Sequence, residues 1–226
     1  MSDVTTPIRI AGLISGGGRT LLNLADAIDR GQLNANIALV VSSRADASGV
    51  QRLRDRGYEV KVASPASLGS MNAVHDAITQ WLDEASIDLV CLAGYLRWLK
   101  IEPRYRGRVM NIHPALLPRF GGPGMYGLHV HRAVLQAGET VSGCTVHFVD
   151  EEYDHGPVIL QRECPVLPDD NPETLAARVF EQECRAYPEA VRLFAEGRLK
   201  IHGDRVEILP TRNPNPAGEP ARPRDV

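Results

Sequence analysis

The sequence has few cysteines, no long apolar run and no cluster of basic residues. Its four cysteines, at positions 91, 144, 164 and 184, include no Cys-x-x-Cys pair, which favours reduced thiols over a disulfide framework. The N-terminus lacks the basic start and apolar core of a signal peptide, and no apolar run approaches the ~20 residues of a membrane span. These absences predict a soluble, cytoplasmic protein with no membrane contact.

The charge balance excludes a further class of partner. The chain carries 25 Lys and Arg against 28 Asp and Glu, a formal net charge of −3, and no run of basic residues offers a patch to a polyanion. We therefore expect no nucleic-acid partner. The length of 226 residues, 43% of them hydrophobic, suits one domain of moderate size or two small ones.

Strand and helix patterns alternate in the first half of the chain. Apolar runs predict strands at residues 8–15, 37–43, 58–63 and 87–94, and helical spacing predicts helices at 21–31, 46–57 and 72–85. Because most of these strands are continuously apolar, they indicate a parallel sheet covered on both faces. The expected fold class is α/β, a Rossmann-like three-layer fold with ligands at the carboxyl ends of the strands.

The second half has a different character. Strands are predicted at residues 108–114, 141–150 and 156–166, with an antiparallel arrangement around a turn at 151–156, and residues 119–131 are glycine-rich. A long helix from Pro172 to Gly197 follows, which Pro188 should bend or interrupt. We expect a single domain over residues 1–209 and a disordered, proline-rich tail over residues 210–226.

The sequence SGGGRT, at residues 15–20, stands between the first strand and the first helix. Glycines there let backbone N–H groups approach an anion, and the start of a helix favours negative charge. The pattern is neither a Walker A loop nor a complete dinucleotide fingerprint, since Leu21 occupies the place of the third glycine. It indicates a small phosphorylated ligand, and a tight turn that needs small residues is the other interpretation.

Asn111 and His113 stand at the end of the strand at 108–114, before a proline. Their spacing places both side chains on one face of the strand. An amide donor beside an imidazole suits a negative charge that develops on a carbonyl oxygen, and a histidine can also hold or deliver a proton. Asp154, in the turn EEYDHG, could favour and orient a cationic histidine. Taken singly, a backbone-bonded strand end and an ordinary turn aspartate explain these residues equally well.

Three further histidines raise the question of a metal. His129 and His131 lie two residues apart, and His147 lies in the strand at 141–150. No His-Glu-x-x-His motif or matching cysteine set accompanies them, so we expect no metal. A metal-dependent hydrolase built on the three histidines is kept as an alternative function.

Five stretches together resemble a known family. They are LISGGGRTLLNL (13–24), LAGYLRWL (92–99), NIHPALLP (111–118), GCTVHFVDEEYDHGPVILQ (143–161) and ARVFEQECRAYP (177–188). Their order is similar to that in the folate-dependent formyltransferases, and within these in the phosphoribosylglycinamide formyltransferases. The resemblance runs from residue 8 to about residue 200. It implies transfer of the formyl group of 10-formyltetrahydrofolate to the amine of 5-phosphoribosylglycinamide in purine biosynthesis, by direct attack and without a metal.

The resemblance also implies roles for individual residues. Asn111 and His113 would stabilise the oxyanion, and Asp154 would keep the imidazole protonated and help a water to carry the proton. The substrate phosphate and glycinamide would be bound by Gly17, Gly18, Arg19, Thr20, Leu21 and Glu183. The folate would be bound by Leu96, Arg97, Trp98, Leu99, Asn111, Asp150, Glu151 and Asp154. Residues expected on the substrate side are His129, His131 and His147.

On this interpretation the N-terminal half binds the substrate phosphate, whereas the C-terminal half binds folate and carries the catalysis. The small-molecule substrates are the expected partners, and a homodimer is compatible with the sequence. Two departures from the family stand out. The stretch RFGGPGMY (119–126) is longer than in the shortest relatives, and Met71 stands where some relatives carry a basic residue near the folate tail.

Three related activities are the competing interpretations. A methionyl-tRNA formyltransferase would need a further C-terminal domain, and a formyltetrahydrofolate deformylase would need an extra domain before Ile8. A formyltransferase acting on an amino sugar nucleotide is the third, and the SGGGRT loop argues against it.

Overall fold

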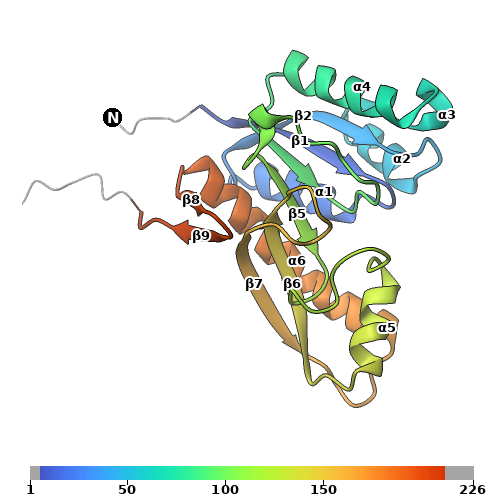
Figure 1. Ribbon diagram of the computed structural model, residues 1–226, viewed down its shortest axis with the longest axis vertical. Coiled ribbons are helices and arrows are strands. Elements are labelled where there is room, and N and C mark those ends of the chain that lie inside the picture. The colour runs from blue at the N-terminus through green and yellow to red at the C-terminus, as the bar shows by residue number, and fades with distance from the viewer. Residues whose placement is uncertain (1–5, 212–226) are drawn as a thin grey trace, which may run out of the picture.

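The computed structural model describes residues 6–211, and of the tail predicted at 210–226, residues 212–226 lie outside them. A nine-stranded sheet organises the chain, in the order β3-β2-β1-β4-β5-β6-β7-β9-β8 (Figure 1). The strands from β3 to β5 pair in parallel, and β5, β6 and β7 pair antiparallel. Their bounds are β1 Ile8–Ile14, β2 Ala35–Ser42, β3 Val60–Val62, β4 Leu89–Leu92, β5 Val109–His113, β6 Val141–Phe148, β7 Val158–Pro165, β8 Leu199–His202 and β9 Arg205–Ile208. The predicted α/β class and the mixed sheet are confirmed.

Within residues 6–211, six α-helices and a short 3-10 helix connect the strands. They are α1 Arg19–Asp29, α2 Ser48–Asp55, α3 Pro65–Leu68, α4 Met71–Glu84, η1 Pro103–Tyr105, α5 Leu128–Gln136 and α6 Pro172–Ala195. None of the helices within residues 6–211 is both long and apolar enough to cross a bilayer. The four cysteines are free thiols, three of them buried.

Alternate residues of the strands pack into two separate cores, one on each face of the sheet. Ile10 and Ile14 of β1 join side chains of α1, α2, α5 and α6 in one core, which we call the α6-side core. Ala11 and Leu13 of the same strand join side chains of α4 in the α4-side core. Because each of the central strands buries both of its faces, these strands read as apolar throughout. The helices therefore form two outer layers, with α4 on one side and α6 on the other (Figure 1).

The two cores extend over different numbers of strands. This difference leaves part of one face of the sheet without a covering helix, and a site can form there. The α6-side core continues through Met110 and Ile112 of β5 into Cys144 and Val146 of β6. The α4-side core extends no further than Val109 on β5 and takes no side chain from β6 or β7. Two loops, at 114–127 and 149–157, therefore stand over this face of β5 and β6 in place of a helix. Asn111, two residues after Val109, points to that face.

Helix α5, the hairpin of β8 and β9, and the short helices α3 and η1 were not predicted. Helix α5 begins directly after Gly127 within the segment classed as glycine-rich, and buries Val130, His131 and Val134. The hairpin of β8 and β9 extends the sheet beyond β7, although most of its residues are exposed. The apolar alternation of Leu-Lys-Ile-His and Arg-Val-Glu-Ile around the two-residue turn Gly203-Asp204 was an available sequence signal for this hairpin.

The expected interruption at Pro188 is wrong, since α6 runs unbroken from Pro172 to Ala195. A proline cannot donate a hydrogen bond to the carbonyl four residues earlier, which here belongs to Cys184. That carbonyl instead accepts a hydrogen bond of 2.9 Å from Nδ2 of Asn23 on α1. A side chain from another helix therefore satisfies the group that the proline leaves without a partner.

Candidate active site

A group of polar side chains lies beneath the two loops, at the carboxyl ends of β1, β4 and β5. A cavity of about 330 Å³ opens there, lined by Asn111, His113 and Asp154 together with Thr20, Glu183 and residues 94–99. Strand β1 leads outward to β2 and the chain returns to β4 on its other side, so the cavity stands at the point where the strand order reverses. Such crevices are the usual ligand sites of open α/β sheets.

The loop after β1 exposes a helix start to this region. Gly18 adopts a left-handed conformation with φ of 68°, and among the described residues no side chain caps α1. Gly49 of α2 packs against the loop so closely that an added Cβ would lie 2.6 Å from the carbonyl oxygen of Gly16. The orphan N–H groups of α1 are thus held open toward an anion.

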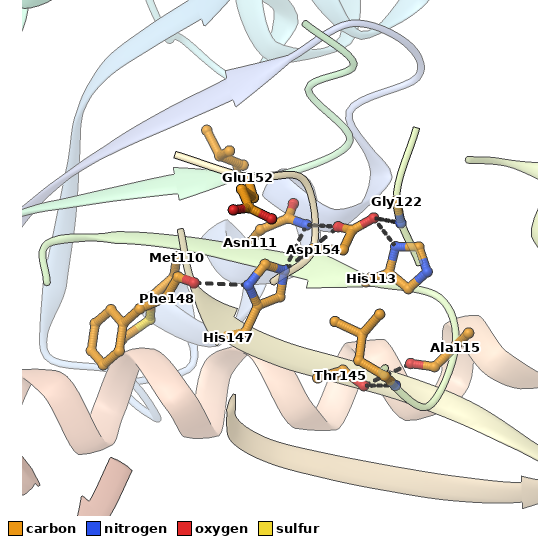
Figure 2. A network of polar contacts seen from close by, with 12 residues as sticks. Met110, Asn111, His113, Ala115, Gly122, Thr145, His147, Phe148, Glu152 and Asp154 are labelled. Atoms are coloured by element: carbon orange, nitrogen blue, oxygen red, sulfur yellow. Dashed lines mark hydrogen bonds and ion pairs between the residues drawn. The ribbon is translucent and has the colours of Figure 1, made fainter. Parts of the chain in front are cut away.

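Asp154 brings the predicted trio together (Figure 2). Its Oδ2 atom lies 3.4 Å from Nδ1 of His113, and its Oδ1 atom lies 3.4 Å from Nδ2 of Asn111. The backbone N–H of Gly122 donates a hydrogen bond of 2.9 Å to Oδ2. Asp154 has a positive φ of 56°, a conformation in which aspartate and asparagine are enriched. The turn therefore aims the carboxylate inward, onto the face of β5 that no helix covers.

His147 adds a fourth member to this network. Its Nδ1 atom lies 2.8 Å from the carbonyl oxygen of Phe148, which only accepts, so Nδ1 carries a proton. Its Nε2 atom lies 3.2 Å from Nδ2 of Asn111 and 3.7 Å from Oδ1 of Asp154. The amide of Asn111 therefore contacts both His147 and Asp154. These contacts orient the amide, and one of them must open before Asn111 can donate to a ligand.

The protonation of His113 is set by two opposing effects. Burial lowers the pKa of His113, and the Asp154 carboxylate and the Phe120 carbonyl oppose that effect without cancelling it. Nε2 of His113 lies 2.8 Å from the Phe120 carbonyl oxygen, so both ring nitrogens face oxygen acceptors. Burial also raises the pKa of Asp154, but His147, His113 and the Gly122 N–H outweigh it and hold the pKa below 3.8. The Asp154 carboxylate is thus ionised. Its negative charge favours the protonated form of His113, which is the direction that we expected.

The segment after β4 forms an opposite wall. Leu96, Arg97, Trp98 and Leu99 all line the cavity, and Leu96 and Trp98 are exposed. The backbone N–H of Leu96 donates to Oγ of Ser15 at 2.9 Å, which ties this segment to the loop after β1. Of the three acidic residues predicted on the facing loop, Asp150 and Asp154 line the cavity. Glu151 does not, since its carboxylate pairs with Arg106 at 2.8 Å.

A second cavity, of about 380 Å³, adjoins the first between α1, α5 and α6. Arg19 and His131 line it, and Pro114, Gly127 and Glu183 line both cavities. Burial raises the pKa of Glu183 to about 7, and Arg19 opposes the effect. A carboxyl group thus stands where the two spaces meet.

The three histidines considered for a metal lie in different surroundings. His147 belongs to the Asp154 network, His131 lines the second cavity, and His129 is exposed beside Tyr126. Within residues 6–211 no three His, Cys, Asp or Glu side chains are placed to hold an ion. The hydrolase alternative therefore lacks the ligand cluster that it requires.

His131 provides a test of the second cavity by stability. Burial lowers the pKa of His131 to about 4, with a contribution from His113. Since the unfolded chain binds the proton at higher pH than the folded chain, stability is lost as the pH falls from 6.5 toward 4. We expect His131→Gln to reduce the loss of unfolding free energy between pH 7 and pH 5 by roughly 2 kcal/mol. Urea unfolding of the parent protein and of His131→Gln at pH 7 and pH 5 measures this difference. Equal losses of unfolding free energy in the two proteins would contradict the prediction.

Several residues of the first cavity were not predicted. Met125, Tyr126, Glu152 and Tyr153 line it, and both tyrosines are 47% exposed. The sequence did offer a signal for two of these residues. Tyr126 lies in a glycine-rich segment, and Tyr153 comes directly before Asp154. Large exposed aromatic side chains often mark a binding surface.

Comparisons with known proteins agree with this geometry. Residues 8–191 match the family model described as formyl transferase. The chain is 38% identical over 195 residues to a phosphoribosylglycinamide formyltransferase of Haemophilus influenzae, covering 85% of this chain and 90% of the relative. Among solved structures, glycinamide ribonucleotide transformylase 1 from Symbiobacterium toebii is similar with a TM-score of 0.84 and 44% identity, covering 91% of this chain and 95% of that one.

A more distant structure shares the fold alone. A formyltetrahydrofolate deformylase from Pseudomonas syringae pv. tomato has a TM-score of 0.79 at 22% identity, with 90% of this chain and 66% of that chain covered.

Proposed function

The chain belongs to the formyl transferase family, and we propose from this that its two adjoining cavities hold the two substrates of one formyl transfer. The activity is that of a phosphoribosylglycinamide formyltransferase, which transfers the formyl group of 10-formyltetrahydrofolate to the amine of 5-phosphoribosylglycinamide in purine biosynthesis. The observation that carries the assignment to this site is the meeting of Asn111, His113 and Asp154 in one cavity.

The first cavity suits the folate substrate. The apolar walls supplied by Leu96, Trp98 and Leu99 fit a flat heteroaromatic ring, and Asp150 and Asp154 offer acceptors to its polar edge. The phosphorylated amine would enter from the second cavity, with its phosphate toward Gly17, Gly18, Arg19, Thr20 and Leu21. Glu183, at the junction, would hold the glycinamide end.

The reaction begins when the substrate amine attacks the formyl carbon. Asn111 would exchange one of its long contacts, at 3.2 Å to His147 or 3.4 Å to Asp154, for a hydrogen bond to the formyl oxygen. Because the amide is already oriented by its contacts with His147 and Asp154, a donor at this position would stabilise the developing negative charge. His113 would act on the same oxygen, and its ring becomes a better donor when Asp154 stabilises the charged form.

The proton that the amine loses must reach the folate nitrogen from which the formyl group leaves. Asp154 is ionised and lies at the centre of the network, so its carboxylate would hold the water that relays this proton. Direct transfer of this kind needs no covalent bond to the protein. We propose that it also needs no metal.

A two-substrate assay tests the proposal. The purified protein should release deformylated folate from a 10-formyl-5,8-dideazafolate only when 5-phosphoribosylglycinamide is present, with one formylated amine formed per folate released. Absorbance and product chromatography measure the two quantities. Folate release without the amine would identify a hydrolase, and release only with an amino sugar nucleotide would identify the other transferase.

The remaining proposals concern the setting of the enzyme. The two small-molecule substrates are its partners, and four free thiols are consistent with a cytoplasmic location. A homodimer remains a proposal that sedimentation can test. So does the division of a single domain over residues 1–209 into a half that binds the substrate phosphate and a half for folate and catalysis.

A further inference from the structure

The Trp98 side chain connects the two walls of the first cavity. It belongs to the segment after β4, lines the cavity and is 41% exposed. Its indole N–H donates a hydrogen bond of 3.4 Å to the backbone carbonyl oxygen of Glu151, on the facing loop at 149–157. A large aromatic ring with one polar N–H suits a binding surface that is partly apolar and partly wet.

The segment that carries Trp98 has little regular structure to hold it. No helix or strand lies between Leu92 and Pro103 in this part of the described chain. The backbone N–H of Leu96 is fixed by its hydrogen bond to Ser15. Beyond Leu96, the direction of the indole therefore depends on the contacts of side chains.

His75 on α4 supplies two such contacts and is 7% exposed. Its Nε2 atom lies 3.3 Å from the carbonyl oxygen of Trp98, which only accepts, so Nε2 carries a proton and donates it to this hydrogen bond. The two rings are nearly perpendicular, at 72°, and their centroids lie 5.3 Å apart. One histidine thus contacts both the backbone and the ring of Trp98.

Packing alone does not account for a histidine at this position. The other buried residues of α4 are Val74, Ile78 and Leu82, and a further aliphatic side chain would fill the core without burying a polar group. The contacts with Trp98 give the polar ring a purpose that an aliphatic residue could not serve.

Glu151, the acceptor of the indole N–H, has support of its own. Its carboxylate pairs with Arg106 at 2.8 Å. Within the same loop, the backbone N–H of Glu152 donates a hydrogen bond of 2.9 Å to the carboxylate of Asp150. A series of contacts therefore runs from α4 through Trp98 to the loop at 149–157.

We propose that His75 is a positioning residue for the folate substrate, and that it acts by holding the Trp98 indole against the facing loop. This rests on the proposed function. The indole would contact the aromatic part of the folate, and its hydrogen bond to Glu151 would set the separation of the two walls. Because Trp98 is already oriented in the free protein, less conformational freedom is lost when the substrate binds.

Steady-state kinetics test the inference. His75→Ala should raise the KM for 10-formyl-5,8-dideazafolate about 3- to 10-fold, the range expected for one hydrogen bond and one ring contact. Turnover and the KM for 5-phosphoribosylglycinamide should change little. Ile78→Val is the matched control, because it also removes atoms from the buried side of α4 but lines neither cavity. It should leave both KM values unchanged.

A double-mutant cycle shows whether His75 acts through Trp98. Trp98→Ala should raise the folate KM at least as much as His75→Ala does. Adding His75→Ala to Trp98→Ala should then have no further effect, since the histidine has lost the side chain that it positions.

Fluorescence supplies a measurement that does not depend on catalysis. In a Trp81→Phe background, Trp98 is the remaining one of the two tryptophans. Its emission should move to longer wavelength when His75 is replaced by alanine, because water gains access to an indole that is no longer held.

Three kinds of result would overturn the inference. They are an unchanged folate KM in His75→Ala or an equal rise in Ile78→Val, additive effects of the substitutions at positions 75 and 98, and an unchanged emission of Trp98. None of them affects the proposed function, which fails only if the parent protein transfers no formyl group to the phosphorylated amine.

Discussion

Replacing His113 by alanine is expected to lower turnover by about 10²- to 10⁴-fold, the usual contribution of a positioned acid or an oxyanion donor. The imidazole is 3% exposed and is fixed between the Phe120 carbonyl oxygen, at 2.8 Å, and Asp154, at 3.4 Å. Within residues 6–211, no neighbouring side chain lies where it could replace the imidazole on β5. Water that enters the space left by the ring would not be held in the orientation that the transition state requires.

Steady-state kinetics and circular dichroism together measure the effect. The KM values should change much less than turnover, and the spectrum should stay that of a folded protein. His202→Ala is a matched control, because His202 lies on β8 and pairs with Glu207 outside both cavities. Turnover within tenfold of the parent in His113→Ala would remove the histidine from the proposed chemistry.

Asp154→Asn should reduce turnover by a similar factor of about 10²–10⁴, since the substitution removes a charge and a proton acceptor. Asparagine tolerates the positive φ of this position, so the turn itself should persist. The new amide can accept from Gly122 through its oxygen, but its nitrogen would then face Nδ2 of Asn111, and two donors repel. The loss should therefore appear mainly in turnover, and the repelling donors and the lost charge should also lower the melting temperature moderately.

Asp170→Asn gives the opposite pattern and serves as the control. Asp170 pairs with Arg178 at 2.5 Å, away from both cavities, so its loss should lower the melting temperature and leave turnover intact. Because the pKa of Asp154 lies below 3.8, acidification from pH 7 to pH 5 should not mimic the variant. An Asp154→Asn enzyme that retains normal turnover would exclude the carboxylate from proton transfer.

The sequence was sufficient for the part of the site that depends on strand geometry. Asn111 and His113 differ by two positions on a short strand, so their shared face followed from the backbone alone. The glycine-rich loop after β1 was likewise found from its place between a strand and a helix. The parallel sheet could be predicted because β4 is buried on both faces, as is most of β1 and β2 from Ile10 and Ile37 onward, and these stretches are therefore mostly apolar.

The contacts and elements that were missed depend on the approach of distant segments, also where the residue itself had been named. The role of His147 follows from its register opposite Asn111 across β5 and β6, which no local pattern reveals. Phe180 lies on a helix where an aromatic residue ordinarily indicates core packing, and only the approach of α1 shows its contact with Arg19. Helix α5 follows directly on a segment rich in glycine, so local composition concealed it.

Pro188 has a consequence that reaches beyond its own helix. The vacant carbonyl that it creates on Cys184 is bound by Asn23 of α1, and Cys184 directly follows Glu183. This hydrogen bond joins the helix that starts in the SGGGRT sequence to the helix that carries Glu183, the carboxyl group between the two cavities. Together with the contact between Arg19 and Phe180, we expect it to hold the loop after β1 and Glu183 at a constant spacing, so that a residue usually regarded as a helix breaker contributes to the geometry of the site.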